Sequence, residues 1–171
     1  MKEMTTQEKT IIGRNARIDF GRRAVGVPAK IDTGADGSSV WASKVRVDKD
    51  GVLRFALFGE GSPYYNGKIF KRTDYSVAMV RSASGHEIMK FRTHFTVRIN
   101  GRKMKVLFGL SDRSSHNYPV LIGRRTIAGK FLVDVTRAEI HEASQKRQAY
   151  NEEFEKDRYA FYKKYHQKGA K

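Results

Sequence analysis

One carboxylate in the sequence stands where it could take part in acid–base chemistry. Asp32 opens the segment Asp32-Thr33-Gly34, directly after the apolar run 24–31 and shortly before a second run that begins at Ser39. The aspartate therefore ends a predicted strand, on a tight turn that Gly34 permits. A carboxylate placed in this way can accept or donate a proton. The bare tripeptide also fits, and by itself favours, an Asx turn closed by the aspartate side chain.

The other residue types offer little alternative chemistry. The chain has no cysteine, which excludes disulfides and thiol chemistry, and it contains neither a His-Glu-x-x-His motif nor a phosphate-binding glycine-rich loop with Lys-Ser/Thr. The five histidines do not have the spacing of a metal site: His86, His94, His116, His141 and His166. We therefore expect surface or turn histidines, no metal ion and no cofactor.

Charge is the extreme feature of the composition, with a formal net charge of +16 over 171 residues. Residues 1–136 hold 25 Lys and Arg against 12 Asp and Glu, whereas residues 137–171 hold 9 against 6. The excess thus lies on the predicted folded body and not on a basic extension. A basic body favours a polyanionic partner: nucleic acid, an acidic peptide or an anionic surface. A basic surface kept for solubility is the plain alternative.

The elements that must position Asp32 are short β-rich runs separated by turn residues, a pattern typical of a sandwich or barrel. The predicted strands are Ile11–Phe20, Val25–Ile31, Ser39–Trp41, Leu53–Phe58, Tyr75–Arg81, Glu87–Arg92, Phe95–Ile99, Lys103–Leu110 and Phe131–Val135. Asn100-Gly101 predicts a tight hairpin, because both residues accept a positive φ. A short helix is expected after Gly123.

The segment after residue 136 predicts one amphipathic helix. It has no proline and many good helix formers. Its apolar stripe consists of Ala143, Tyr150, Phe154, Phe161 and Tyr165. Thr136 and Glu139 fit a capping box at its start, and Gly169 fits its end. We expect the stripe to pack against the body or a second subunit.

Two motifs together resemble a known family. Asp32-Thr33-Gly34-Ala35-Asp36, a hairpin, and then Leu121-Ile122-Gly123-Arg124 resemble the retroviral-type aspartic proteases (retropepsins) in order and spacing, over about residues 11–136. The segments Lys30–Ala35, Val80–Ser82, Ser111–Ser114 and Tyr118–Arg124 resemble more closely a bacterial and archaeal retropepsin-like family. That family, RimK-associated and RimB-like, is often labelled "ATP-dependent zinc protease" and is associated with glutamate ligases. One group in it is understood to trim poly-glutamate tails from a ribosomal protein.

The resemblance implies an all-β, retropepsin-like closed barrel or sandwich (the acid protease fold) over residues 1–136, followed by a charged C-terminal helix over residues 137–171. Asp32 would be the catalytic aspartate, and Thr33 would lock the active-site loops of two subunits together. Gly34 would let the backbone approach the substrate, in a loop that continues through Ala35.

The resemblance also implies roles around the loop. Asp36 would pair with Arg124, which ties the catalytic loop to the helix after Gly123. A flap would close over bound peptide, with five residues that contribute to it: Arg81, Ser82, Ser84, Gly85 and His86.

A single Asp-Thr-Gly motif gives each chain half of such a site, so activity would require a symmetric homodimer. Two adjacent carboxylates cannot both ionise cheaply and would share one proton. The ionised aspartate could then take a proton from water while the protonated one donates to the scissile carbonyl.

The expected function is therefore an aspartic peptidase acting on acidic, poly-glutamate-like peptides or protein tails, with a possible link to a ribosomal protein. Two alternatives stay open: a non-catalytic module that docks on RNA or the ribosome through its basic face, and a general or self-processing peptidase. Nucleic acid is thus a possible partner but not the favoured one. The polar start of the chain and the absence of a long apolar run favour a cytoplasmic protein without a membrane span.

Overall fold

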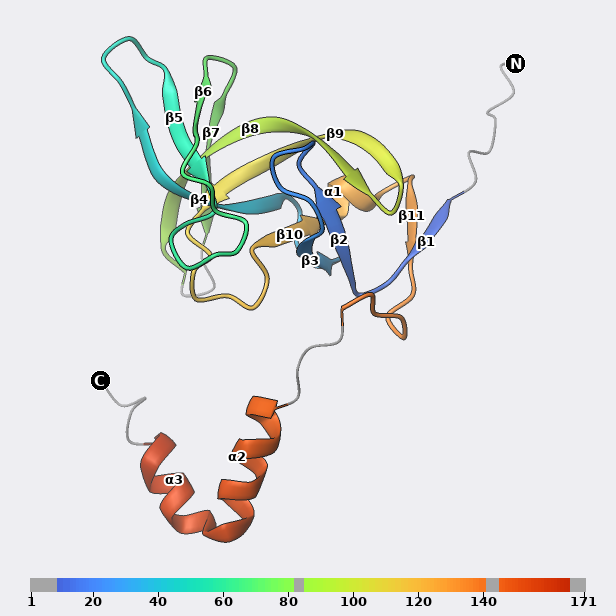
Figure 1. Ribbon diagram of the computed structural model, residues 1–171, viewed down its shortest axis with the longest axis vertical. Helices are drawn as coiled ribbons and strands as arrows, with labels where there is room; N and C mark the ends of the chain where they lie inside the picture. Colours follow the sequence, from blue (N-terminus) through green and yellow to red (C-terminus); the bar gives the residue numbers. More distant parts are fainter. Residues whose placement is uncertain (1–8, 82–84, 141–144, 167–171) are drawn as a thin grey trace. The chain divides into compact units, whose positions relative to one another are not determined.

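The chain folds into two compact units in the computed structural model, which describes residues 9–81, 85–140 and 145–166 (Figure 1). The first unit, the body, ends at Ile140, and the second, the tail, follows it. Strands dominate the body and helices form the tail. The predicted all-β class with a helical C-terminus is confirmed.

Within the described residues the body contains eleven strands and one short helix. In chain order they are β1 (Thr10–Ile12), β2 (Asn15–Asp19), β3 (Val27–Asp32), β4 (Ser38–Val47), β5 (Leu53–Leu57), β6 (Ile69–Arg72), β7 (Ser76–Arg81), β8 (Glu87–Ile99), β9 (Arg102–Ser111), β10 (Val120–Gly123), α1 (Arg124–Ile127) and β11 (Phe131–Val133). The short helix after Gly123 is confirmed. Strands β6 and β10 have no counterpart among the predicted strands, and the predicted strand Ile11–Phe20 is two strands, β1 and β2.

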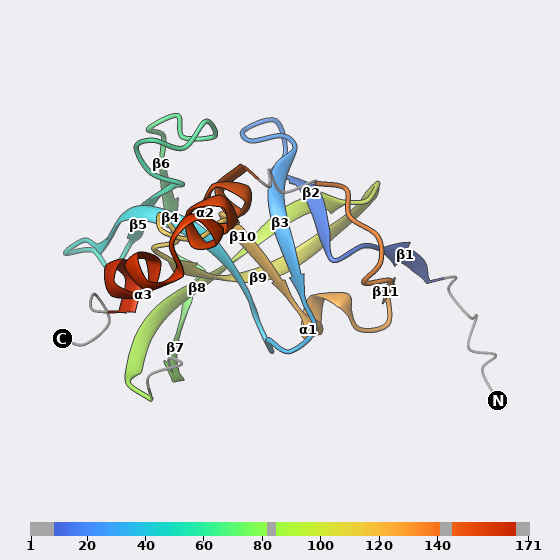
Figure 2. The same cartoon turned by 90° about the horizontal axis from the view of Figure 1, so that it is seen from below.

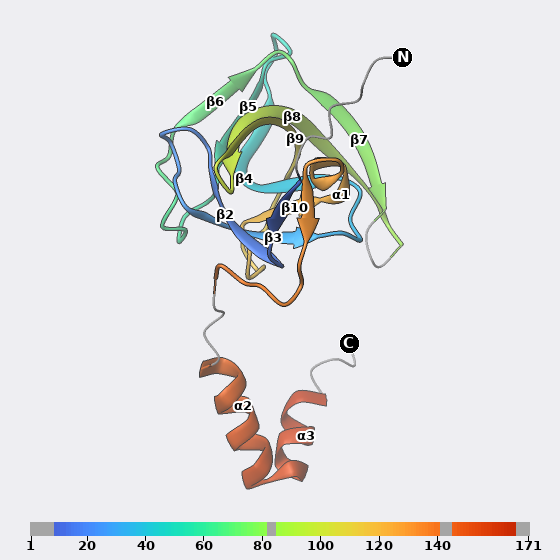
Figure 3. The same cartoon turned by 90° about the vertical axis from the view of Figure 1, so that its right-hand side faces the viewer.

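Six strands of the body close into a ring. Hydrogen-bonded neighbours follow the order β10, β3, β2, β8, β9, β4, and β4 pairs in turn with β10. Figure 3 shows these strands curling around a common interior. Strands β5 and β6 extend the sheet beyond β4, β7 extends it beside β8, and β1 and β11 form a separate parallel pair. The closed barrel implied by the resemblance is confirmed.

The barrel interior is filled by alternate residues of its strands. Phe95, Val97 and Ile99 of β8 are buried, while the residues between them are exposed, as the two-residue period of a strand requires. The Phe20 ring lies 5.6 Å from the rings of Phe95 and Phe108, measured between centroids. This aromatic core makes the barrel a packed scaffold for the loops at its edge.

Strand β8 is continuous where the sequence predicts two strands, Glu87–Arg92 and Phe95–Ile99. The polar pair at the predicted break keeps the alternation, because Thr93 is buried and its hydroxyl donates to the Asp74 carbonyl at 3.1 Å. The hairpin at Asn100-Gly101 is confirmed, with φ values of 45° and 77°.

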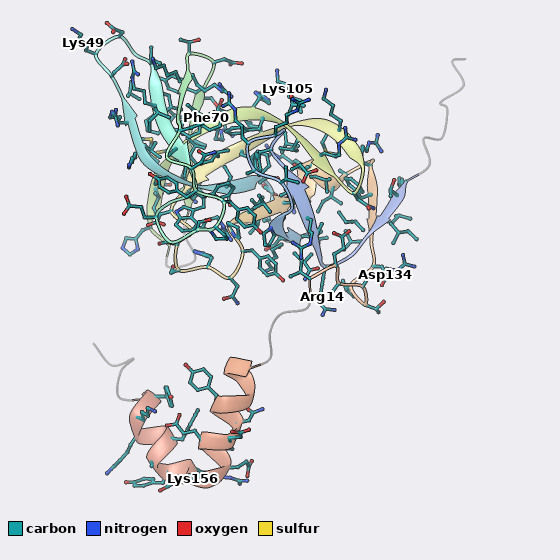
Figure 4. The ribbon with its side chains drawn as sticks, viewed as in Figure 1. Arg14, Lys49, Phe70, Lys105, Asp134 and Lys156 are labelled. Atoms are coloured by element: carbon teal, nitrogen blue, oxygen red, sulfur yellow. The ribbon has the colours of Figure 1, made fainter. Side chains whose placement is uncertain are left out.

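The end of the body returns to its beginning. Figure 4 labels Arg14 and Asp134 at the same end of the body, and the Arg14 N–H donates to the Arg137 carbonyl at 2.9 Å. The predicted capping box is wrong, because its two members have other partners here. The Thr136 hydroxyl donates to Asp134 Oδ1 at 2.6 Å, and Glu139 accepts from the Arg17 N–H at 2.9 Å.

The tail forms two helices, α2 (Gln145–Lys156) and α3 (Arg158–His166), where the sequence predicts one. Asp157 separates them, and its Oδ1 accepts from the N–H groups of Tyr159 (3.1 Å) and Ala160 (2.9 Å), as a helix N-cap does. The Tyr150 and Tyr165 rings lie 5.4 Å apart, whereas one straight helix would separate them by about 22 Å.

The aromatic stripe of the tail therefore packs on itself across the two helices, with Phe161 contacting both Phe154 and Tyr165. Its predicted end at Gly169 and its first member, Ala143, lie outside the described residues. No helix in the described part of the chain is long and apolar enough to cross a membrane.

Candidate active site

Asp32 is the last residue of β3 and opens the loop that leads to β4. Its Oδ1 accepts hydrogen bonds from the backbone N–H groups of Gly34 at 3.1 Å and Ala35 at 3.2 Å. These bonds make the Asx turn that the bare tripeptide predicts. The same conformation is compatible with an acid–base role for the carboxylate.

The second oxygen of Asp32 is far less engaged. Lys30 Nζ lies 3.5 Å from Oδ2, and its own side chain is 53% exposed, so the ion pair is weak and screened by water. The Asp32 side chain itself is 28% exposed. One carboxylate oxygen is thus fixed by two backbone N–H groups, whereas the other has only the weak contact with Lys30.

Strand β10 supports the loop from the side. It runs parallel to β3, with Gly123 opposite Asp32, and Figure 2 shows β3 and β10 side by side with α1 following β10. The Gly123 N–H donates to the Ser38 hydroxyl at 3.1 Å. A Cβ on Gly123 would lie 2.8 Å from the Ala35 carbonyl oxygen, so the approach is too close for any residue but glycine.

The first turn of α1 holds the far end of the loop. The backbone N–H groups of Arg124 and Arg125 donate to the carbonyls of Ala35 (2.8 Å) and Asp36 (3.2 Å). The Arg124 guanidinium forms an ion pair with the Asp36 carboxylate. The loop is therefore attached at both ends to the segment 123–125, which brings together two motifs about ninety residues apart.

Strands β7 and β8 form the hairpin in which the sequence places a flap. Their register ends at Arg81 opposite Glu87. Ser82 and Ser84 lie outside the described residues, and Gly85 and His86 are exposed. Arg81, Gly85 and His86 thus lie at one end of this hairpin, and Thr33 and Gly34 are exposed in the loop after β3.

A cleft of about 840 Å³ runs between the segment 35–39, the hairpin strands β7 and β8, and β9. Six cationic side chains line it: Lys90, Arg92, Lys105, Arg113, Arg125 and Lys130. Lys105, on β9, is labelled in Figure 4. The one acidic residue in this lining is Asp36, which already pairs with Arg124. The cleft is therefore suited to an anionic guest.

Sequence reasoning assigns no role to Arg113, although it lies in a segment that carries the resemblance. The side chain is buried, and it donates from Nε to the Tyr118 carbonyl at 3.0 Å and from Nη1 to the Ser39 hydroxyl at 3.2 Å. Burial lowers the pKa of Arg113, and the Asp32 carboxylate acts in the opposite direction. Arg113 thus lies close enough to Asp32 for their charges to interact.

The cations of β8 could have been found from the strand period. Lys90 and Arg92 alternate with the residues that lead into the barrel core, so they must share the opposite face. The pKa of Lys90 is lowered by burial and by the neighbouring Arg113. Among the described residues, no group of three or more His, Asp or Glu side chains could hold a metal ion.

The closed barrel and the Asp-Thr-Gly loop braced by the Ile-Gly-Arg segment define a retropepsin-like fold. Residues 11–144 match the model of the RimB-like family, described as "Retropepsin-like aspartic endopeptidase RimB". The chain belongs to this family.

Two curated relatives are each 30% identical to the chain over 136 residues. Both are named "Probable alpha-L-glutamate ligase", one from Shewanella pealeana and one from Shewanella halifaxensis. The match covers 75% of this chain and 29% of each relative, so the chain corresponds to less than a third of their length.

A solved structure shares the fold at 20% identity, with a TM-score of 0.58. It is the crystal structure of Lpg0085, a protein of unknown function (DUF785) from Legionella pneumophila. The match covers 77% of this chain and 97% of that one. At this identity the likeness concerns the fold alone.

Proposed function

We propose that the protein is an aspartic peptidase in which Asp32 from each of two identical chains activates water for hydrolysis of a peptide bond. The observation that carries the proposal is the geometry of the Asp32 carboxylate, because Oδ1 is held by two backbone N–H groups while the side chain remains 28% exposed. Two such carboxylates facing each other would share a proton. One would accept a proton from the attacking water, and the other would donate to the carbonyl oxygen of the substrate.

The homodimer is part of the proposal, because one chain supplies one aspartate. Thr33 is exposed beside Asp32, where a second loop could meet it. The β1–β11 pair adds an apolar face, since Ile11 and Leu132 are register partners and are 45% and 54% exposed. A symmetric dimer uses the same patch on both chains, and this patch is apolar enough to serve.

The proposed substrate is an acidic peptide, with poly-glutamate as the form that fits best. The cationic lining of the cleft attracts anions at long range and fixes them at short range. The relatives named as glutamate ligases supply a related chemistry, because a ligase that joins glutamates makes the kind of chain that such a peptidase would cut.

A ligase activity for this chain is the second candidate, because the relatives carry that name. The chain matches only 29% of their length, so the name can belong to the remainder. The sequence has no glycine-rich loop with Lys-Ser/Thr, which is one kind of site for nucleotide phosphates. The residues around Asp32 favour hydrolysis.

The test compares the full chain with its Asp32→Asn variant on peptides that carry a poly-glutamate tail or a neutral tail, at low and high salt. We expect the wild type to cleave the acidic peptide faster, with a rate that falls as salt rises. Asp32→Asn should remove cleavage while the dimer persists in sedimentation analysis. Undiminished cleavage by Asp32→Asn would refute the proposed role of Asp32 and with it the aspartic mechanism. Equal rates on both tails without salt dependence would refute the substrate class.

The same variant separates the peptidase from a basic module that docks on RNA or the ribosome. A docking module depends on its positive surface, so its binding would be indifferent to Asp32→Asn. Cleavage of neutral and acidic peptides at equal rates, lost in Asp32→Asn, would instead indicate a general processing peptidase.

A further inference from the structure

Arg113 is a buried cation whose direct partners are neutral. The side chain is 8% exposed, and its two hydrogen bonds go to the Tyr118 carbonyl and the Ser39 hydroxyl. Nη2 has no hydrogen-bond partner among the described residues. Burying a guanidinium without a counterion is costly, so the position calls for a nearby anion.

Lys90 makes that need greater. It lies half-buried on β8, close enough to Arg113 for each charge to act on the other, and both side chains line the cleft. Neither forms an ion pair with a carboxylate of the described residues. The acid that acts on Arg113 is Asp32, which the proposed reaction uses. Two like charges in a partly desolvated cleft repel each other, and a bound anion would offset that repulsion.

Arg92 is an independent sign of a missing partner. It lies two residues beyond Lys90 on the same face of β8 and lines the same cleft. Its Nε is buried and has no hydrogen-bond partner among the described residues. Buried donors are nearly always paired in folded proteins, so this one too fits a site that awaits an acceptor.

We propose that Arg113 and Lys90 form a carboxylate-binding subsite in the cleft beside the loop that follows Asp32, and that this subsite takes an acidic side chain of the bound peptide. This inference rests on the proposed peptidase function and deepens it, by naming the residues that select the substrate. A guanidinium with free N–H groups binds a carboxylate through directed hydrogen bonds, and an ammonium beside it adds a second charge-assisted contact. Ser39 and the Tyr118 carbonyl hold the guanidinium in place before the peptide arrives.

A purely structural role for Arg113 would explain its bonds to Tyr118 and Ser39, but it would not explain why Lys90 lies beside it in the cleft. Lys90 therefore carries the test. Lys90→Met keeps the length of the side chain and removes its charge. Lys71→Met is the matched control, because Lys71 is exposed on β6 and lies outside the lining of the cleft.

Binding is measured in the Asp32→Asn background, so that no peptide is cut. Fluorescence anisotropy compares two peptides that differ only in Glu or Gln at every position of a short tail. We expect the Glu peptide to bind about tenfold or more tightly than the Gln peptide. Lys90→Met should bring that ratio near one, whereas Lys71→Met should leave it close to its starting value. An equal affinity for both peptides, or a preference that survives Lys90→Met, would overturn the subsite.

Cleavage by the otherwise unchanged enzyme then separates the two proposals. If binding is selective and depends on Lys90 but the wild-type chain cleaves neither peptide, the peptidase proposal fails and the subsite proposal stands. If the enzyme cleaves the Glu and Gln peptides with equal kcat/KM, the peptidase proposal stands and the subsite proposal fails. Arg113→Met is measured beside Lys90→Met, with its thermal unfolding recorded, and should also bring the ratio toward one if it folds.

Discussion

Gly123 lies directly opposite Asp32 in the parallel register of β10 and β3. The absence of a side chain there lets the loop after Asp32 pass close to the end of β10, where the Gly123 N–H donates to the Ser38 hydroxyl and the first turn of α1 donates to the loop carbonyls. The position of Asp32 therefore depends on a residue far from it in sequence. This contact joins the two motifs that carry the family resemblance, because the Ile-Gly-Arg segment braces the Asp-Thr-Gly loop.

Gly123→Ala should displace the loop. The new Cβ would lie 2.8 Å from the Ala35 carbonyl oxygen and would overlap the Gly37 carbonyl, both of which are backbone groups. We expect a loss of about 1–3 kcal/mol in the free energy of unfolding, as for other overpacked sites. Urea unfolding measures it, and cleavage of the acidic peptide should fall with it. Gly37→Ala is the control for stability, because its Cβ would meet nothing within 4 Å. An equal stability of both variants would contradict the account.

The pair of Asp36 and Arg124 should matter more for activity than for stability. Both side chains are more than half exposed, so water screens the ion pair. A double-mutant cycle with Asp36→Asn and Arg124→Met should give a coupling in unfolding free energy below about 1 kcal/mol. The kcat of each single variant should fall, because the loop that carries Asp32 is attached through this pair. A coupling well above that value would show that the pair is a stability element.

Local signals in the sequence were enough for the loop and the main hairpin. Asp32-Thr33-Gly34 and Asn100-Gly101 specify their turns through residues that lie next to each other. The β-rich pattern left a sandwich or a barrel open, and the order of the motifs indicated both the family and the closed barrel. These features depend on short stretches of chain, which a sequence shows directly.

The subsite could not be predicted in the same way. Lys90 comes from β8 and Arg113 from the segment after β9, and only the closure of the sheet brings them to one cleft. The prediction of a single helix in the tail was wrong for a different reason. Its apolar spacing continues through Asp157, so periodicity indicates one helix, while the aspartate side chain caps a second helix and lets the stripe fold on itself.

Asp48 should make stability depend on pH in the acid range. The Val52 N–H and the Arg54 guanidinium, at 2.9 Å and 2.6 Å, lower the pKa of this carboxyl below its ordinary value. A depressed pKa in the folded state stabilises the protein above the unfolded pKa, and the contribution is lost as pH falls through the folded pKa. Asp48→Asn should therefore be less stable than wild type at about pH 7, and the difference should shrink at about pH 2.5. Chemical unfolding at both pH values measures it, and a constant difference would contradict the assignment.

Leu132→Lys should weaken the proposed dimer. Leu132 is register partner to Ile11, and together they form the exposed apolar face of the β1–β11 pair. Placing a lysine on each copy would bury two charges where the apolar surfaces meet, so we expect dissociation to rise by about tenfold or more in sedimentation equilibrium. Val25→Lys adds the same charge at another exposed apolar position and should leave association close to wild type. Because the proposed site takes half of its residues from each chain, activity of Leu132→Lys should recover at high protein concentration. A variant that dimerises like wild type would place the interface elsewhere on the body.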